Sequence, residues 1–265
     1  MKKSVLIILT IFSLPAFSQE MEPKETEVWE PVPAIVTPGK ATEAPSDAII
    51  LFDGKNLDQW QNPQFKGEPG TEKEVAANLS KLDKNFKHQP AGWVVENGAM
   101  VVKPGNGAIE TKEKFGNFQL HIEWLTPKME GKSDQGYSNS GIFLMSLYEL
   151  QVLNSYENKT YSNGQAGSIY KQHIPLVNAS NPPDEWQAYD VVFTAPVFDE
   201  SGKLVSPAYV TVFHNGVLIQ NHAELKGPTV YIGKPFYIAH PEQMPLRLQD
   251  HGDKVRFRNI WIRNL

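Results

Sequence analysis

The sequence predicts an all-β protein: an antiparallel two-sheet β-sandwich or jelly roll with one short inserted helix. Its 265 residues include 13 Phe, 9 Tyr, 6 Trp, 19 Gly and 20 Pro, a composition that favours turn-rich β structure over a helical bundle. After Asp47, short apolar segments are separated by turn residues. Strands and helices do not alternate, so a parallel sheet is not expected.

Period-2 alternation and turn residues locate the strands along the chain. Asn97 with Gly98, and Asn215 with Gly216, each predict a hairpin with a type I′ turn. The expected strands are 48–52, 93–96, 99–102, 118–124, 141–145, 148–153, 186–194, 209–214, 217–220, 246–249 and 255–262.

The last strand changes its alternation, since Ile260 and Ile262 share the parity of Arg256 and Arg258. This predicts a β-bulge near Asn259. The expected core includes Phe118, Leu120, Ile122, Leu150, Val152, Phe257 and Trp261.

The inserted helix is expected after Thr71. Thr71 can cap it, and Glu74 stands three residues later, as in a capping box. Val75, Leu79 and Leu82 share one helical face.

The first 46 residues predict an export signal followed by an extended arm. Residues 1–18 have a basic start, an apolar segment and small residues before Gln19, as in a secretory signal peptide. Residues 19–46 are rich in Pro, Glu and Thr. The main domain is therefore expected over 47–265. We expect a periplasmic or secreted protein, with no membrane insertion once the signal is removed.

Composition also excludes several chemistries. The absence of Cys excludes disulfides, thiolate nucleophiles, Cys-ligated zinc and a lipid-modified Cys anchor. A formal net charge of −5 argues against a nucleic-acid partner.

Three expected strands place polar side chains opposite their apolar face. Glu149 and Gln151 oppose Leu150 and Val152, and the other two strands carry Gln119, His121 and Glu123, and Arg247, Gln249 and His251. One interpretation is an ordinary solvated face, and the other is a saccharide site. A retaining glycosidase needs two carboxyl groups close together, and the strand of Glu149 supplies only one on that face. Proton abstraction by a single base fits this strand better.

Several motifs, in this order, resemble the 3-keto-disaccharide hydrolase family of exported bacterial proteins. They cover residues 50–55, 93–98, 118–124, 139–143, 148–153, 167–170, 185–186, 248–252 and 255–261. The resemblance implies a concanavalin-like jelly roll and a glycoside or oligosaccharide substrate oxidised to a ketone at C3. Such a ketone acidifies the C2 proton, so a base can form an enolate that expels the C1 substituent before water adds.

Glu149 is the expected general base and His251 the expected acid–base or metal-binding residue. The alternative roles are a strand-edge salt bridge for Glu149 and a turn position for His251. A divalent metal bound by Glu and His remains an open possibility. The expected substrate-binding residues are Glu123, Asn139, Gln151, Tyr170, Gln249 and Arg256. The competing hypothesis for the whole domain is a non-catalytic carbohydrate-binding module of the same fold.

Overall fold

The computed structural model describes residues 21–65, 70–83 and 85–265, in two compact units that meet between Ile35 and Val36. In the first unit, a 3-10 helix, η1, spans Pro23–Thr26. The second unit, Val36–Leu265, contains the sandwich together with residues 36–46 of the predicted arm. The expected signal peptide lies outside the described residues. No helix among the described residues is long and apolar enough to cross a membrane.

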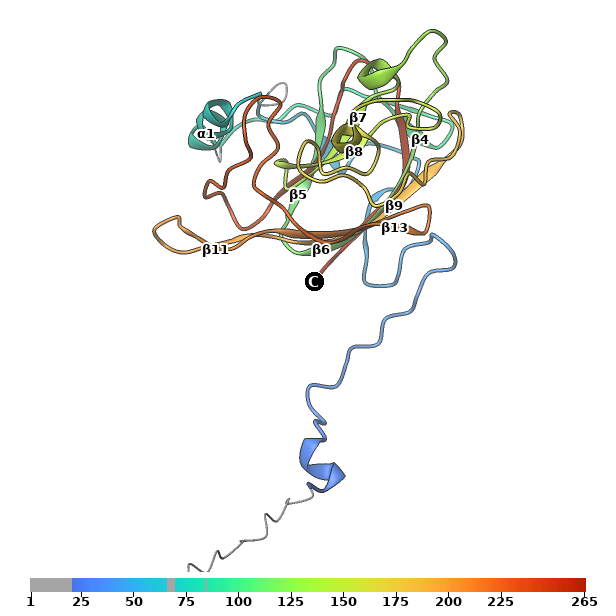
Figure 1. Ribbon diagram of the computed structural model, residues 1–265. Helices are drawn as coiled ribbons and strands as arrows, with labels where there is room; N and C mark the ends of the chain where they lie inside the picture. Colours follow the sequence, from blue (N-terminus) through green and yellow to red (C-terminus); the bar gives the residue numbers. More distant parts are fainter. Residues whose placement is uncertain (1–20, 66–69, 84) are drawn as a thin grey trace, which may run out of the picture. The chain divides into compact units, whose positions relative to one another are not determined.

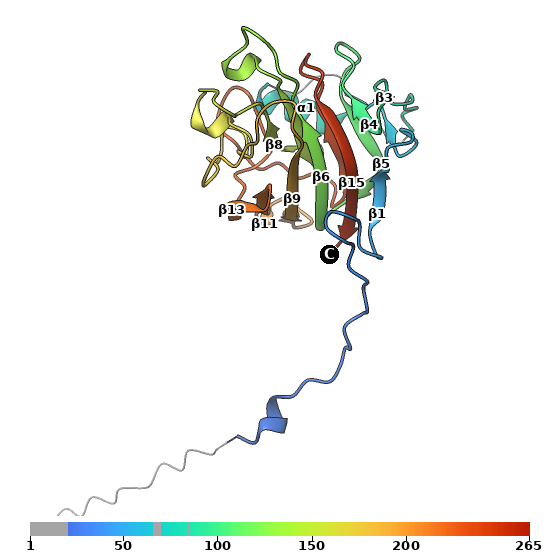
Figure 2. The ribbon, with the colours of Figure 1, turned by 90° about the vertical axis from the view of Figure 1, so that its right-hand side faces the viewer.

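Eight antiparallel strands form the larger sheet, in which β15 (Arg256–Asn264) is central. One edge of β15 pairs with β6, and the other pairs with β4 near its start and with β1 near its end. Figure 2 shows β9, β6, β15 and β1 side by side in this sheet. The other strands are β1 (Ile49–Phe52), β3 (Val94–Glu96), β4 (Ala99–Val101), β6 (Phe118–Leu125), β9 (Gln187–Thr194), β12 (Tyr209–His214) and β13 (Val217–Glu224).

Five antiparallel strands form the smaller sheet, in the order β2-β5-β14-β7-β8. They are β2 (Trp60–Gln61), β5 (Ile109–Phe115), β14 (Met244–Leu248), β7 (Ser140–Leu144) and β8 (Tyr148–Val152). A separate two-stranded ribbon joins β10 (Val197–Phe198) to β11 (Leu204–Ser206). In Figure 1, β7 and β8 lie above the layer that contains β6, β9 and β13. The predicted all-β antiparallel sandwich is therefore confirmed.

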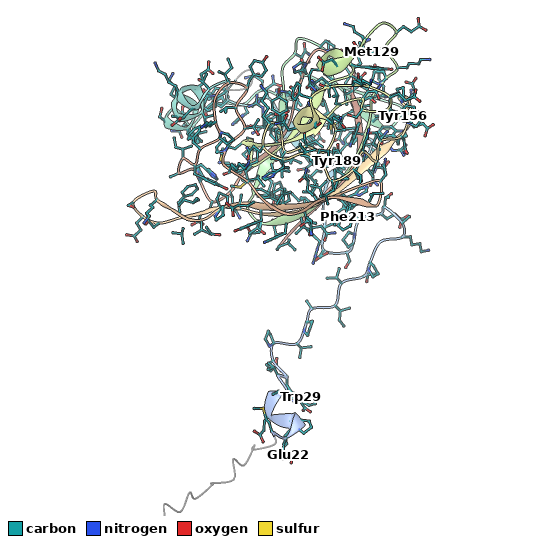
Figure 3. All side chains as sticks on the ribbon, in the orientation of Figure 1. Glu22, Trp29, Met129, Tyr156, Tyr189 and Phe213 are labelled. Atoms are coloured by element: carbon teal, nitrogen blue, oxygen red, sulfur yellow. The ribbon has the colours of Figure 1, made fainter. Side chains whose placement is uncertain are left out.

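The core lies between the two sheets. Figure 3 labels Tyr189, which is fully buried there, and Phe213, which is 39% exposed. Alternation in β6 sends Phe118, Leu120 and Ile122 into this core, as predicted. Leu150, Val152 and Phe257 join the same cluster.

The predicted bulge in β15 is confirmed, and it corrects the expected position of Trp261. The register of β15 against β6 shifts between Arg258 and Trp261, and Asn259 has a φ of 46°. Phe257, Ile260 and Ile262 therefore enter the core. Trp261 is buried on the other face, where its ring stacks on His121 at 5.4 Å.

Both predicted hairpin turns are present, since Asn97, Gly98, Asn215 and Gly216 all have positive φ. Helix α1 spans Glu72–Ser80, and the backbone N–H of Glu74 donates to the Thr71 hydroxyl. Val75 is buried and Leu79 packs on the core, whereas Leu82 lies beyond the helix end and is exposed.

Candidate active site

A row of side chains crosses the outer face of the five-stranded sheet. Strand register places Glu149 of β8 beside Phe143 of β7, and Phe143 beside Arg247 of β14. Arg247 in turn pairs in register with Glu110 of β5. The neighbours of these residues, such as Ile142, Leu150 and Leu248, point into the core. The row therefore forms the floor of this face, opposite the core.

A cavity of about 700 Å³ lies over the β7 and β8 part of this floor, beside the residues that follow β14. Six of the eight predicted site residues line it: Asn139, Glu149, Gln151, Tyr170, Gln249 and His251. The sequence analysis missed Gln135, Phe143, Tyr161, Thr229 and Tyr231, which also line it. Most of the missed residues come from loops without periodic patterns, which explains why alternation did not reveal them.

Gly141 makes room for the carboxyl group of Glu149. A Cβ atom at Gly141 would lie 2.6 Å from Glu149 Oε1 and 2.9 Å from Phe143 Cε2. The backbone N–H of Glu149 donates to the Thr229 hydroxyl at 3.0 Å, and Glu149 is 5% exposed. A glycine inside a strand often marks such a close approach, so this signal was present in the sequence.

Gln135 holds the amide side chains of the cavity. Its Oε1 accepts from Gln151 Nε2 at 3.1 Å and from Asn139 Nδ2 at 3.3 Å. Its own Nε2 donates to the Thr160 hydroxyl and to the Gly164 carbonyl. One side chain thereby couples β8 to the loops on both sides of the cavity.

Two buried amide oxygens belong to this cavity. Gln151 is 1% exposed and Gln249 is 9% exposed, and no described residue hydrogen-bonds Oε1 of either side chain. Because a buried polar atom without a partner is costly, these oxygens favour a ligand that carries hydroxyl donors.

A pair of tyrosines forms another wall. The hydroxyls of Tyr161 and Tyr170 lie 2.7 Å apart. Burial raises the pKa of both, and the nearby charge of Glu149 raises both further. Both phenols are therefore protonated at neutral pH.

His251 is exposed and lies in the turn after β14. The Asp250 carboxylate fixes this turn by accepting from the backbone N–H groups of Gly105, Gly107 and Gly252. His251 thus stands at the solvent side of the cavity.

The expectation that Glu123 lies near this site is wrong. Glu123 is on β6 of the eight-stranded sheet, whose outer face points away from the outer face of the five-stranded sheet. There it belongs to a group that we call the His121 cluster: Thr42, His121, Glu123, Asp190, Arg258 and Asn259. Strand alternation placed Glu123 outward correctly but could not show to which sheet β6 belongs.

Arg256 is the second predicted residue away from the cavity. It lies on β15, pairs in register with Val101 and Leu125, and donates to the Glu96 carbonyl at 3.2 Å. The Asp250 carboxylate accepts instead from backbone N–H groups of the 105–107 turn and of Gly252.

Over 21–65, 70–83 and 85–265, no three His, Asp or Glu side chains are grouped so as to hold a metal ion. Glu149 and His251 would need further ligands from a substrate or from water.

A concave site of this size, with aromatic side chains and a few convergent polar groups, has the form of a small-molecule binding site. Comparison with known families gives the class of protein. The family model described as 3-keto-alpha-glucoside-1,2-lyase-like domain matches residues 47–263, and the chain belongs to this family.

Solved structures agree with the assignment. A protein from Parabacteroides distasonis, described as a "putative glycosyl hydrolase", is 43% identical with a TM-score of 0.80, covering 95% of this chain and 100% of that one. A second such protein from the same organism is 20% identical with a TM-score of 0.53, over 83% of this chain and 94% of its own, and it supports the fold alone. No curated protein matches the chain.

Proposed function

We propose that this protein cleaves the glycosidic bond of 3-keto-glycosides, with Glu149 as the base that removes the C2 proton. The observation that carries the proposal is the position of the Glu149 carboxyl group. It lines a sugar-sized cavity over Gly141, in the same cavity as the buried amide oxygens of Gln151 and Gln249. Family membership supports the same chemistry.

The elimination requires a base that removes the C2 proton and an acid that protonates the leaving oxygen. Glu149 takes the proton from C2, the C–H electron pair forms the C2=C3 bond, and the C3 oxygen becomes an enolate. When the C3 carbonyl re-forms, the pair moves to C1=C2 and the bond from C1 to the leaving oxygen breaks. Water can then add across C1=C2 to give the free 3-keto sugar. This route needs no second carboxylate beside Glu149, in contrast to double displacement.

His251 is the proposed proton donor for the leaving oxygen. It is exposed at the solvent side of the cavity, and the aglycone of a glycoside must extend toward solvent. The leaving oxygen needs a proton as its bond to C1 breaks, and an imidazole ring is a common general acid in such steps.

We further propose that the protein is exported, on the basis of the pattern in residues 1–18. N-terminal sequencing of the processed protein should then begin near Gln19. A processed protein that still begins at Met1 contradicts export by this signal.

The activity is tested with purified protein and 3-keto-trehalose or an aryl 3-keto-glucoside, with the unoxidised glycosides as controls. We expect cleavage of the keto substrates alone, with solvent deuterium incorporated at C2 of recovered 3-keto sugar. Parallel reactions with a chelator show whether a metal takes part. Binding without cleavage supports the carbohydrate-binding module instead. Equal cleavage of oxidised and unoxidised glycosides contradicts the elimination route.

A further inference from the structure

Hydrogen-bond donors and acceptors are separated within the cavity. Gln151 Nε2 donates to Gln135 Oε1 and to the Gly164 carbonyl, so both of its protons have partners. Its Oε1 is the polar atom left for a ligand, and Gln249 Oε1 is a second buried acceptor that no described residue hydrogen-bonds. Asn139 Nδ2 is likewise directed to Gln135, at its carbonyl and its Oε1. The amide wall of the cavity therefore accepts hydrogen bonds.

The tyrosine pair has the opposite character. Two phenol hydroxyls carry two protons, and the 2.7 Å bond between Tyr161 and Tyr170 uses one of them. The second proton remains available to an acceptor on a ligand.

Backbone pairing places Tyr170 beside the proposed base. The Tyr170 N–H donates to the Glu149 carbonyl at 3.1 Å, and Ile169 pairs with Leu150 as a β-bridge. Ile169 and Leu150 both enter the core, so Tyr170, which follows Ile169, and Glu149, which precedes Leu150, project to the cavity side. Tyr170 and Glu149 consequently line the same cavity from adjacent segments.

A sugar ketone has no proton to donate, whereas each ring hydroxyl has one. We propose that Tyr170 donates its hydrogen bond to the C3 oxygen of the substrate, as ketone and then as enolate, and that Tyr161 is a positioning residue that orients the Tyr170 hydroxyl. Gln151 and Gln249 accept from sugar hydroxyls, so the polarity of the two walls selects the oxidised ring and its orientation. This inference rests on the proposed function.

The chemistry of the enolate agrees with a neutral donor at this position. Charge develops on the C3 oxygen as Glu149 takes the proton, and a donor already in place stabilises that charge without reorganisation. Tyr231 and His251 also line the cavity, but Tyr231 is 62% exposed and His251 is exposed, so both face solvent. Of these three ring donors, Tyr170 is the most enclosed.

The test separates enolate formation from bond cleavage. 1,5-Anhydro-3-keto-glucitol has no leaving group at C1, so exchange of its C2 proton with deuterium from solvent, followed by NMR, reports enolate formation alone. We expect Tyr170→Phe to slow this exchange and the cleavage of an aryl 3-keto-glucoside alike, by about 10²–10³-fold. Tyr161→Phe should have a smaller effect on both, because Tyr170 keeps its proton. Tyr209→Phe, on β12 of the other sheet, is the matched control and should change neither rate.

Binding gives an independent measurement. The wild-type protein should prefer the 3-keto analogue over unoxidised 1,5-anhydroglucitol. In Tyr170→Phe this preference should fall by up to about tenfold, the value of one hydrogen bond to a neutral ketone. If wild-type protein exchanges and cleaves but Tyr170→Phe exchanges at the wild-type rate with the same preference, the inference is overturned. Slower cleavage with unchanged exchange also overturns it, because Tyr170 would then act on the leaving group. Wild-type protein that neither exchanges nor cleaves overturns the proposed function itself.

Discussion

Glu149 and Glu123 occupy equivalent positions on two strands but have different surroundings. Each lies on the outward face of its strand, and each is less than 10% exposed. The Glu123 carboxylate accepts from Arg258 Nε at 2.6 Å, from Asn259 Nδ2 at 2.9 Å and from the Thr42 hydroxyl at 3.2 Å. The Glu149 carboxyl group instead lines a cavity, over the space left by Gly141.

The difference lies in what covers each sheet. Residues 36–46 pack on the eight-stranded sheet. There the Thr42 hydroxyl donates a hydrogen bond to Glu123, and the Thr42 carbonyl accepts one from Trp261 Nε1. Loops around residues 134–139, 161–170 and 229–231 rise over the five-stranded sheet and leave a hollow between them. The Glu123 carboxylate is therefore enclosed by the segment that covers its sheet, whereas the Glu149 carboxyl group faces a cavity that a substrate can enter.

The largest expected effect separates the two glutamates by activity. Glu149→Gln keeps the size of the side chain and removes its basicity, so turnover of a 3-keto-glucoside should fall by about 10²–10⁴-fold. Glu123→Gln is the matched variant, because it makes the same change on the opposite sheet. It should keep wild-type turnover and lose about 1–3 kcal/mol of stability, since Arg258, whose side chain is 42% exposed, loses its charged partner. Rates come from product release and stabilities from urea unfolding. Equal turnover for both variants would remove Glu149 from the site.

The second prediction tests the space over Gly141. Gly141→Ala places a methyl group 2.6 Å from Glu149 Oε1, so the carboxyl group must move. We expect a loss of about 10²-fold in turnover from the displaced base, and about 1–3 kcal/mol in stability from overpacking. Gly136→Ala is the control, because a Cβ there meets nothing within 4 Å. Turnover that stays at the wild-type level in Gly141→Ala would show that the position of the carboxyl group is not critical.

The smallest effect is the pH dependence of stability, which arises in the His121 cluster. Burial alone would raise the pKa of Glu123, but hydrogen bonds from His121, Asn259 and Arg258 lower it from 4.5 to about 2. The stabilisation is therefore complete above about pH 4.5 and is lost as the pH falls toward 2. Burial alone would lower the pKa of His121, but hydrogen bonds to Asp190 and Glu123 raise it from 6.5 to about 9. That contribution is complete below about pH 6.5 and is lost as the pH rises through 9.

Each of the two pKa shifts corresponds to roughly 3 kcal/mol of stability. Both include the contact between His121 and Glu123, so the two contributions do not add. Urea unfolding between pH 3 and 10 should show a stability plateau near pH 4.5–6.5. In Glu123→Gln the decline on the acid side should shrink. An unchanged acid-side decline in that variant would assign it to other carboxylates.

Much of the fold could be predicted from the sequence because local patterns determine it. Alternation in β6 and β14 separates core residues from outward ones, and Asn-Gly pairs set both hairpins. Strand β5 was missed because Thr111 is buried while Lys112, Glu113 and Lys114 are exposed, which interrupts the period of two. A register shift in its pairing with β14, between Pro245 and Arg247, accompanies that interruption. Trp261 was misplaced because its face depends on the bulge at Asn259.

The candidate site could be predicted in part, because strand alternation marks its strand residues but not its loop residues. Glu149, Gln151, Gln249 and His251 were found from strand parity, and the motifs added Asn139 and Tyr170. Gln135 and Tyr161 stand in loops, where no periodicity marks the side chains that turn toward a cavity. Gln135 is assigned its role by its contact with Gln151, and Tyr161 by its contact with Tyr170. Strand periodicity predicts neither contact.

By itself, the sequence determined that the chain forms antiparallel strands, which residues of each strand oppose the core, and where the hairpins turn. These properties follow from steric and hydrophobic preferences of near neighbours. Only the tertiary structure decided that β6 and β8 belong to different sheets, so that Glu123 joins an ion-pair cluster while Glu149 lines the cavity. The physical reason is that strand partners and covering loops are chosen by contacts between residues distant in the chain, such as Thr42 with Glu123 and Gln135 with Gln151.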